Sequence, residues 1–372
     1  MEVGVLKETG PGERRVALVP ETVKKLAAKK IVTRIERGAG LAAGFADADY
    51  EAAGAVLGTR SETLAADTWL AVARPSLAAL GELRTRTALV SLQYPLAAPE
   101  FVAAANARKL TTIALDMIPR TSLAQSMDVL SSQANLAGYW AVVAAAARLP
   151  KIFPLLMTAA GTITPARVLI MGVGVAGLQA IGTARRLGAV VEATDVRPET
   201  KEQVESLGGR FLSVAGVEVK QGTGGYAAEQ SEEYKAQQAE LVSRAIAQAD
   251  VVITTALIPG KRAPRLVTDA QVASMRPGSV LVDLAAEQGG NIEGSEAGKD
   301  VQRHNVTIVG PLSPASHVAY HASQAFSRNL EKLLLHLTAD GAWKLDLKEE
   351  ITRGCVITQD GDTVHERVRQ GA

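Results

Sequence analysis

Three glycines directly follow a short apolar run near the middle of the chain. The run Arg167–Met171 has the character of a buried β-strand, and Gly172, Gly174 and Gly177 follow it with the spacing G-x-G-x-x-G. In this pattern the first glycine allows a tight turn, the second lets a pyrophosphate approach the backbone, and the third lets a helix pack closely on the strand. The helix start offers free N–H groups to phosphate oxygens. The spacing predicts the phosphate end of a dinucleotide site, with a purely structural turn as the alternative.

An acidic residue ends the next apolar run. Residues 190–194 read as a second strand, and Asp195 follows them. A carboxylate at this place can accept hydrogen bonds from the adenosine ribose hydroxyls and repel a 2′-phosphate, which favours NAD(H) over NADP(H). Arg197 is the opposing signal, since an arginine could recruit a 2′-phosphate. Because Asp195 is present, we predict NAD(H).

A second polar segment, residues 117–135, lies upstream and contains Arg120, Gln125, Asp128 and Ser131. Chemically, the amide could bind a nicotinamide carboxamide, and the arginine and aspartate could hold each other and orient the nicotinamide ribose. Equally, Asp128 could cap a helix while Arg120 forms a loop salt bridge. Both interpretations stay open on chemistry alone.

Composition bounds the class of protein. The chain has 372 residues, 47% hydrophobic residues, 4% aromatic residues and a formal net charge of +1. The length favours two domains, and the absence of basic blocks excludes a nucleic-acid surface. The single cysteine, Cys355, excludes an internal disulfide and indicates a reducing compartment. No signal peptide is recognisable, and no run reaches the roughly 18–20 apolar residues of a membrane span.

Short apolar runs alternate with helical patterns along both halves, which predicts an α/β fold of two Rossmann-like, doubly wound parallel-sheet domains joined by long helices. The long helical patterns are residues 128–147 and 317–337. We expect a discontinuous N-terminal domain, 1–127 plus 318–372, and an NAD(H)-binding domain, 128–317. The glycine-rich segment from Gln221, which includes Gly225 and Tyr226, is long enough to predict a lid or binding loop.

Several motifs together resemble a known family. They are the segment from Arg120 to Tyr139, the run Met157-Thr-Ala-Ala-Gly-Thr, the glycine turn, Ala193-Thr-Asp-Val-Arg-Pro, Ile253-Thr-Thr-Ala-Leu-Ile-Pro-Gly and Asp283-Leu-Ala-Ala-Glu-Gln-Gly-Gly-Asn. Over about residues 1–335 the chain is similar to the NAD(H)-binding domain I, or alpha subunit 1, of proton-translocating NAD(P) transhydrogenase, a relative of alanine dehydrogenase.

The resemblance implies roles for individual residues. It assigns Arg120, Gln125 and Asp128 to hydride transfer at the nicotinamide, and it implies a mobile loop that carries Tyr226. The residues that it implies for cofactor binding are Ser131, Gly172, Gly174, Val175, Ala176, Gly177, Asp195, Val196, Arg197, Gly225, Tyr226, Ala256 and Leu257. No metal site is predicted, because His317 and His321 have helical spacing but no third ligand.

A difference from alanine dehydrogenases separates two activities. Those enzymes resemble this chain but carry a lysine and a histidine for pyruvate binding and acid–base work, where this chain has Ala73 and Gln93. Amino-acid oxidation needs a group that takes up a proton, whereas hydride transfer between two nicotinamides does not. The difference favours transhydrogenase, and Arg15, which resembles a substrate-carboxylate ligand, is expected to remain as structure.

The resemblance therefore implies a subunit that binds NAD(H) and passes hydride from NADH to NADP⁺ on a partner beta subunit. Membrane-spanning subunits would couple this transfer to proton translocation. The expected assembly is a homodimer on the cytoplasmic face of the membrane, held there through the complex. The alternatives are an alanine-dehydrogenase-like amino-acid oxidoreductase and a non-catalytic NAD-binding regulatory module.

Overall fold

The computed structural model describes residues 1–214, 232–258 and 260–371. Two compact units are present: unit 1 contains residues 1–133 and 315–372, and unit 2 contains residues 134–314. The chain passes from unit 1 to unit 2 within helix α6 (Val129–Arg148) and returns in the 3₁₀-helix η6 (Pro314–Val318). Among the described residues, no helix is long and apolar enough to cross a membrane.

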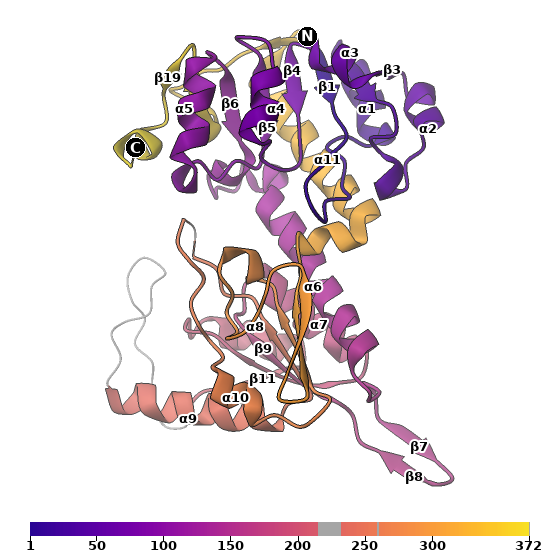
Figure 1. Cartoon of the computed structure of the whole chain (residues 1–372), viewed down its shortest axis with the longest axis vertical. Helices are drawn as coiled ribbons and strands as arrows, with labels where there is room; N and C mark the ends of the chain where they lie inside the picture. Colours follow the sequence, from indigo (N-terminus) through magenta and orange to yellow (C-terminus); the bar gives the residue numbers. More distant parts are fainter. Residues whose placement is uncertain (215–231, 259, 372) are drawn as a thin grey trace. The chain divides into compact units, whose positions relative to one another are not determined.

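Unit 1 is built on an eight-stranded sheet with the order β19-β18-β6-β5-β4-β1-β2-β3 (Figure 1). Its strands are β1 (Glu2–Val5), β2 (Val32–Glu36), β3 (Val56–Gly58), β4 (Thr68–Leu70), β5 (Ala88–Ser91), β6 (Thr111–Ala114), β18 (Val356–Gln359) and β19 (Asp362–Thr363). Its helices are α1 (Pro20–Ala27), α2 (Asp47–Ala52), α3 (Arg60–Leu64), α4 (Leu77–Glu82), α5 (Pro99–Ala107), α11 (Ala319–Leu337), α12 (Glu350–Cys355) and α13 (Glu366–Gln370). A two-residue hairpin pair, β16 (Thr338–Ala339) and β17 (Ala342–Trp343), follows α11.

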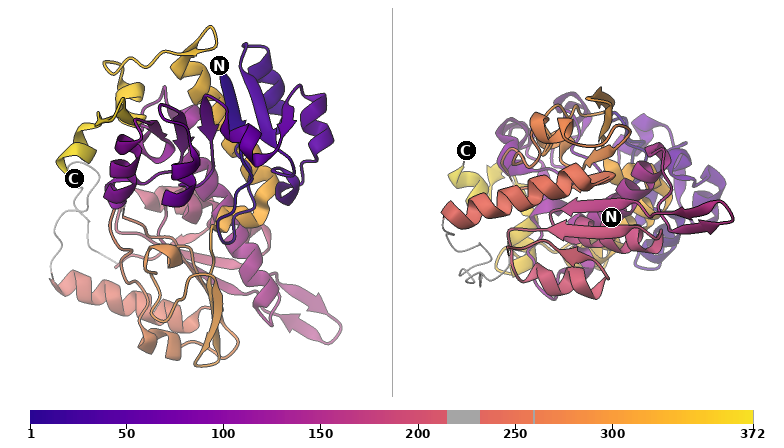
Figure 2. Two further views of the ribbon diagram at one scale, coloured as in Figure 1. Left: turned by 45° about the horizontal axis from the view of Figure 1, so that its top comes forward. Right: turned by 90° about the horizontal axis from the view of Figure 1, so that it is seen from below.

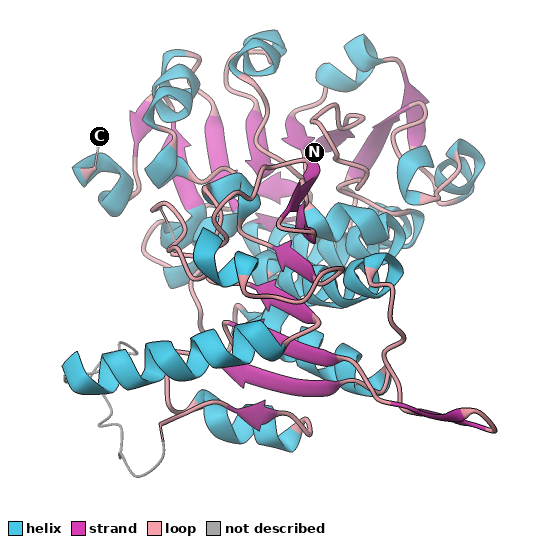
Figure 3. Cartoon of the chain, turned by 60° about the horizontal axis from the view of Figure 1, so that its bottom comes forward, coloured by secondary structure: helices cyan, strands magenta, loops and turns pink. Residues whose placement is uncertain are grey.

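Unit 2 is built on a seven-stranded sheet with the order β11-β10-β9-β12-β13-β15-β14. Its strands are β9 (Arg167–Met171), β10 (Val190–Thr194), β11 (Arg210–Phe211), β12 (Val251–Thr254), β13 (Val280–Asp283), β14 (Lys299–Arg303) and β15 (Val306–Gly310). Its helices are most of α6, α7 (Val175–Arg186), α8 (Thr200–Ser206), α9 (Glu232–Gln248) and α10 (Asp269–Ala273). A separate hairpin, β7 (Leu156–Thr158) and β8 (Gly161–Ile163), projects from this unit in every view (Figure 2, Figure 3).

Both sheets repeat one strand order. In each unit, six strands taken in chain order would be arranged 3-2-1-4-5-6, apart from the edge strands β14, β18 and β19. In such sheets a ligand binds beyond the carboxyl ends of the strands, where the order reverses beside the first strand. The expected doubly wound α/β class is confirmed, and the reversal lies next to β9 in unit 2 and next to β1 in unit 1.

The sheets are not purely parallel, which corrects the sequence-based expectation. Strand β14 pairs antiparallel with β15, and β18 pairs antiparallel with β6. The β14–β15 turn contains His304 and Asn305 with φ of 52° and 61°, the left-handed geometry of a tight hairpin. Strand β14, Lys-Asp-Val-Gln-Arg, is largely exposed and polar, so its sequence carries little strand signal.

Helix α11 belongs to the core of unit 1. Its buried side chains Phe326, Leu330, Leu333 and Leu334 have no solvent exposure and pack in one hydrophobic cluster with residues of β1, β2 and α1. The amphipathic pattern of the helix explains this, because apolar residues three or four positions apart share one face. The C-terminal 58 residues of unit 1 are therefore integral to the unit that the N-terminal residues begin.

Candidate functional site

The turn between β9 and α7 is shaped by two glycines that cannot be replaced without displacing backbone. Gly172 has φ of +101°, which L-residues rarely adopt, and a Cβ there would lie 2.6 Å from Thr255 Oγ1. A Cβ on Gly177 would lie 1.9 Å from the carbonyl oxygen of Gly172. The first turn of α7 therefore packs directly against the end of β9, as the sequence predicts for a phosphate turn.

Gly174 differs from its neighbours, because the protein itself does not need a glycine there. Its φ is −82°, and a Cβ would meet nothing within 4 Å. It is also the N-cap of α7, and no side chain caps the helix. Uncapped N–H groups beneath open space are what a pyrophosphate requires, so the described residues fit a dinucleotide.

Helix α6 holds the first turn of α7 from another side. A Cβ on Gly138 would lie 2.1 Å from the carbonyl oxygen of Ala176. The helices can therefore touch backbone to backbone only because residue 138 has no side chain. The position of Ala176, and with it the helix N-terminus, is fixed by this contact.

Asp195 joins the end of β10 to the glycine turn. Its Oδ2 accepts the Val173 N–H at 2.7 Å, and its Oδ1 accepts the Arg197 N–H at 2.9 Å. The Arg197 guanidinium binds the same carboxylate, through Nε to Oδ1 at 2.9 Å and through Nη2 to Oδ2 at 3.0 Å. Burial opposes ionisation, but the hydrogen bonds from Arg197 and Val173 hold the pKa of Asp195 below its ordinary value.

The loop after β12 is positioned by a residue that the sequence analysis missed. Asn291 is fully buried, accepts the Ala256 N–H at 3.0 Å and donates to the Ala256 carbonyl at 2.9 Å. Its own backbone N–H donates to Asp283, whose carboxylate also accepts the N–H of Ile292. Asn291 thus fixes the predicted cofactor-binding segment Ala256–Leu257. A polar residue in a glycine-rich stretch after a strand was the available signal.

Four predicted or neighbouring apolar side chains are exposed at the carboxyl ends of β9, β10 and β12. Val175 is 40% exposed, Val196 77%, Leu257 52% and Ile258 46%. Large apolar side chains left in water beside a phosphate turn suit the flat faces of a bound nucleotide. Gly225 and Tyr226, which the sequence analysis also assigns to this site, lie outside the described residues.

The residues predicted for the nicotinamide end belong to unit 1. Arg120 and Gln125 are exposed, and Gln125 begins a 3₁₀-helix, Gln125–Met127. The Asp128 carboxylate accepts the Ser131 N–H at 2.9 Å and the Ser131 hydroxyl at 2.6 Å. This is the N-cap interpretation of Asp128, and the described residues contain no Arg120–Asp128 ion pair. The site residues are thus divided: Arg120, Gln125, Asp128 and Ser131 lie in unit 1, and the turn, Asp195 and Arg197 lie in unit 2.

Unit 1 has no phosphate turn at the corresponding position. After β1, 14 residues precede α1 at Pro20, so no helix N-terminus follows the strand directly. Glu36, at the end of β2, accepts the Lys7 N–H at 2.8 Å, much as Asp195 accepts the N–H of Val173. An acid that ties the second strand to the turn after the first is therefore present in both units and does not itself mark a nucleotide site.

The segment after β1 carries a buried charged cluster instead. Arg15 binds Glu13 through Nε and Nη2 at 2.8 and 2.6 Å and donates from Nη1 to Gln133 at 2.8 Å. The Arg15 and Glu13 side chains are only 7% and 2% exposed. Burial opposes ionisation of Glu13, but Arg15 holds the pKa of its carboxyl below its ordinary value. Nearby, burial raises the pKa of Glu8 to about 7, against the hydrogen bond from the Val72 N–H and with repulsion from Glu13.

Gln93 is turned into the sheet of unit 1. It is fully buried, and its amide nitrogen donates to the Ile113 carbonyl at 3.1 Å. The backbone N–H of Gln93 donates to Asp116 at 2.7 Å, and Arg74 donates to its carbonyl at 3.1 Å. The side chain at this position is therefore committed to β6 and is not presented to a substrate.

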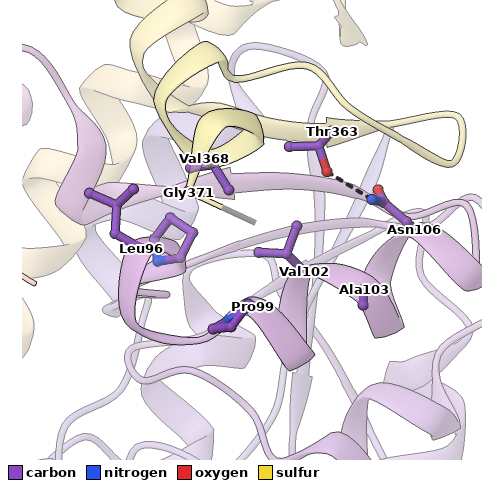
Figure 4. Close-up of a pocket in the computed structure, with 9 residues that line it drawn as sticks. Leu96, Pro99, Val102, Ala103, Asn106, Thr363, Val368 and Gly371 are labelled. Carbon is purple, nitrogen blue, oxygen red and sulfur yellow. Dashed lines mark hydrogen bonds between the residues drawn. The ribbon is translucent and has the colours of Figure 1, made fainter.

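A pocket in unit 1 lies between α5, the segment Pro95–Pro99 and the C-terminal helix α13 (Figure 4). Its polar contact is the hydrogen bond from Asn106 to Thr363, 2.8 Å long. It contains no charged side chain and none of the predicted site residues, so its chemistry does not indicate a nucleotide.

Comparison with known proteins gives the context for this site. The alanine dehydrogenase/PNT N-terminal domain model matches residues 4–137, and the C-terminal domain model matches residues 141–366. The chain is 47% identical to the first of the alpha-subunit chains of NAD(P) transhydrogenase from Rhodospirillum rubrum, over 98% of both chains. It is 32% identical to an alanine dehydrogenase of Mycobacterium tuberculosis, over 79% of this chain and 75% of that protein. The crystal structure of transhydrogenase from Sinorhizobium meliloti matches with a TM-score of 0.87 and 44% identity, covering 99% of this chain and 100% of that one.

The two glycines of the helix start predict opposite outcomes for the same substitution. Gly177→Ala places a methyl group against the Gly172 carbonyl and should lower the free energy of unfolding by about 3 kcal/mol. Gly174→Ala meets open space at an ordinary φ and should leave thermal stability within about 1 °C of the native chain. Thermal unfolding followed by circular dichroism measures both. Equal losses in the two variants would contradict the described packing.

The raised pKa of Glu8 predicts a pH-dependent gain on its replacement by glutamine. The unfolded carboxyl ionises near 4.5 and the folded one near 7, so its favourable contribution is complete below 4.5 and is lost as pH rises towards 7. Glu8→Gln should match the native Tm at pH 5 and exceed it by about 2 °C or more at pH 8. Glu51→Gln, at an exposed position on α2, is the control. A Tm difference that does not change with pH would show that Glu8 ionises normally.

Proposed function

The chain belongs to the alanine dehydrogenase/PNT family, and from this premise we propose that it is the NAD(H)-binding subunit of a proton-translocating NAD(P) transhydrogenase. In this proposal it binds NADH, and hydride passes to NADP⁺ on a partner subunit. Membrane-spanning subunits would couple the transfer to proton movement and would hold this chain at the cytoplasmic face of the membrane.

The proposal is carried by a contrast between the two units. Unit 2 has an uncapped helix start under an open glycine, whereas unit 1 has Ala73 and the inward-turned Gln93 where alanine dehydrogenases carry a lysine and a histidine. A chain that keeps the cofactor turn but has no acid–base pair for an amino acid needs another hydride acceptor. A second nicotinamide is such an acceptor, because hydride transfer between two rings requires no proton transfer.

The chain's own residues would supply binding and orientation. When bound, the nicotinamide supplies the hydride. The N–H groups at the start of α7 would hold the pyrophosphate, and Asp195 would accept the adenosine ribose hydroxyls. Gln125 would bind the carboxamide, and Arg120, Asp128 and Ser131 would orient the nicotinamide ribose. Correct placement of the reacting carbon is the main contribution that a protein can make to such a transfer.

One observation favours a second candidate, an alanine-dehydrogenase-like oxidoreductase. Arg15 remains buried beside Glu13 and Gln133, and Glu8 in the same segment has a pKa of about 7. An arginine that could bind a substrate carboxylate and a carboxyl that titrates near neutrality would be useful to such an enzyme. However, Glu13 already occupies two donor groups of the Arg15 guanidinium, and Val72 donates to Glu8 at 2.6 Å.

The two candidates predict different reactions of the purified chain. Mixed with the NADP(H)-binding domain of a transhydrogenase, the chain should accelerate reduction of an NADP⁺ analogue by NADH at least ~100-fold over either component alone. Gly174→Ala should abolish most of this acceleration while it preserves the fold, because its methyl group fills the space for the pyrophosphate. No acceleration by the native chain would refute the transhydrogenase proposal. Reduction of NAD⁺ with L-alanine by the chain alone would establish the alternative.

The β7–β8 hairpin supports a homodimer. Every residue in its two strands is exposed, and no charged residue occurs from Ile152 to Ala166. Leu155 is 55% exposed, Met157 76% and Ile163 44%. An isolated two-stranded hairpin is marginally stable in water, and exposed apolar surface of this kind favours association. We therefore propose that the hairpin packs against a second copy of the chain.

Substitution in the hairpin tests the dimer. Met157→Asp should weaken self-association at least ~10-fold, because it places a charge in an apolar interface. Leu77→Asp, at another exposed leucine on α4, should leave the association unchanged. Sedimentation velocity over a range of concentrations measures the equilibrium. A native chain that is monomeric throughout, or a Met157→Asp variant that associates normally, would count against the hairpin interface.

A further inference from the structure

The carboxylate of Asp195 is saturated by donors from its own unit. Oδ1 accepts the Arg197 N–H and the Arg197 Nε–H, each at 2.9 Å. Oδ2 accepts the Val173 N–H at 2.7 Å and an Arg197 Nη2–H at 3.0 Å. A carboxylate offers about four lone-pair positions, so these four donors leave none for a ribose hydroxyl. The residue that would recognise the ribose is occupied by a neighbouring side chain.

Only two of the four donors can leave without a change in the backbone. The Val173 N–H belongs to the glycine turn, and the Arg197 carbonyl is held by the Thr200 N–H at 3.2 Å and its hydroxyl at 2.7 Å. These contacts fix both backbone donors. The Arg197 side chain, in contrast, is 40% exposed, so its guanidinium can rotate into solvent. Its departure would free one lone pair on each carboxylate oxygen.

The donors that leave match the donors that would arrive. A guanidinium presents two parallel N–H groups to a carboxylate, and the vicinal 2′- and 3′-hydroxyls of a ribose present two O–H groups. We propose that the Arg197 side chain is a latch on Asp195, which the ribose hydroxyls of the nucleotide displace. This inference rests on the proposed NAD(H) binding, and it assigns Arg197 to competition with the nucleotide, opposite in sign to a binding role.

The latch also separates the two nucleotides. A 2′-phosphate replaces a hydroxyl donor by acceptor oxygens, so NADPH cannot replace both guanidinium donors on Asp195. Removal of the guanidinium should therefore help NADH and should not help NADPH. A structural role for Arg197 would affect both nucleotides alike, and a direct phosphate contact would weaken NADPH and leave NADH without a gain.

The test measures nucleotide dissociation constants of the full chain by fluorescence titration with NADH and NADPH. Arg197→Ala should tighten NADH binding about 3- to 10-fold, because the ion pair no longer has to be broken, and should not tighten NADPH binding. Arg186→Ala removes the same charge from the exposed face of α7 and is the matched control, with unchanged affinity. In an Asp195→Ala background, a further Arg197→Ala change should have no effect on NADH affinity.

Weaker NADH binding by Arg197→Ala, with Arg186→Ala unchanged, would overturn the latch while leaving the proposed function intact. A native chain that binds no NADH would overturn both. Arg197→Gln is the second variant, for the case that Arg197→Ala lowers the Tm. It keeps a side chain of similar length without the fork, and it should show the same preference for NADH.

Discussion

The nucleotide site of unit 2 depends on two places where backbone touches backbone. Gly177 lies against the Gly172 carbonyl, and Gly138 of α6 lies against the Ala176 carbonyl, at separations that exclude a methyl group. Together they hold the first turn of α7 between a strand and another helix. The direction of the free N–H groups, and the open space at Gly174, follow from this arrangement, since a helix that was displaced outward would present its N-terminus elsewhere.

The two units show how little of this depends on the fold itself. Both sheets have the same strand order, and each uses an acid at the end of its second strand, Glu36 or Asp195, to accept the backbone N–H two residues beyond the first strand. In unit 2 a helix starts at once, and its N-terminus remains available to an anion. In unit 1 a longer segment intervenes, and its buried charges, Glu13 and Arg15, are paired with each other. A similar architecture thus supports a cofactor site in one unit and an ion-pair cluster in the other.

Much of the architecture could be predicted from the sequence, because parallel strands buried on both faces are continuous apolar runs. The starts of α1 at Pro20 and α5 at Pro99 and the long helices α6 and α11 carry equally clear signals. The antiparallel strands β14 and β18 and the hairpin β7–β8 could not be assigned, since edge strands are short, exposed and weakly patterned.

The candidate site was predictable only to a degree. The glycine turn and Asp195 have fixed spacings from their strands, and spacing can be read from a sequence. The cap that Asp128 provides, the inward rotation of Gln93 and the support that Asn291 gives to Ala256 depend on contacts between residues distant in the chain or on a choice of rotamer. Such contacts have no local pattern. The saturation of Asp195 by Arg197 is of the same kind, since the sequence places the two residues close together but does not say which lone pairs are used.

The insertion of unit 2 between the two segments of unit 1 has a consequence for synthesis on the ribosome. Unit 2 is complete once residue 314 has emerged, whereas unit 1 waits for α11 and for β18, which pairs with β6. Domains generally fold as units while the chain is made. The cofactor-binding unit can therefore fold first, while residues 1–133 still expose the apolar surface that Phe326 and Leu330 later cover. During that interval the N-terminal segment is the region of the nascent chain that most needs protection from aggregation.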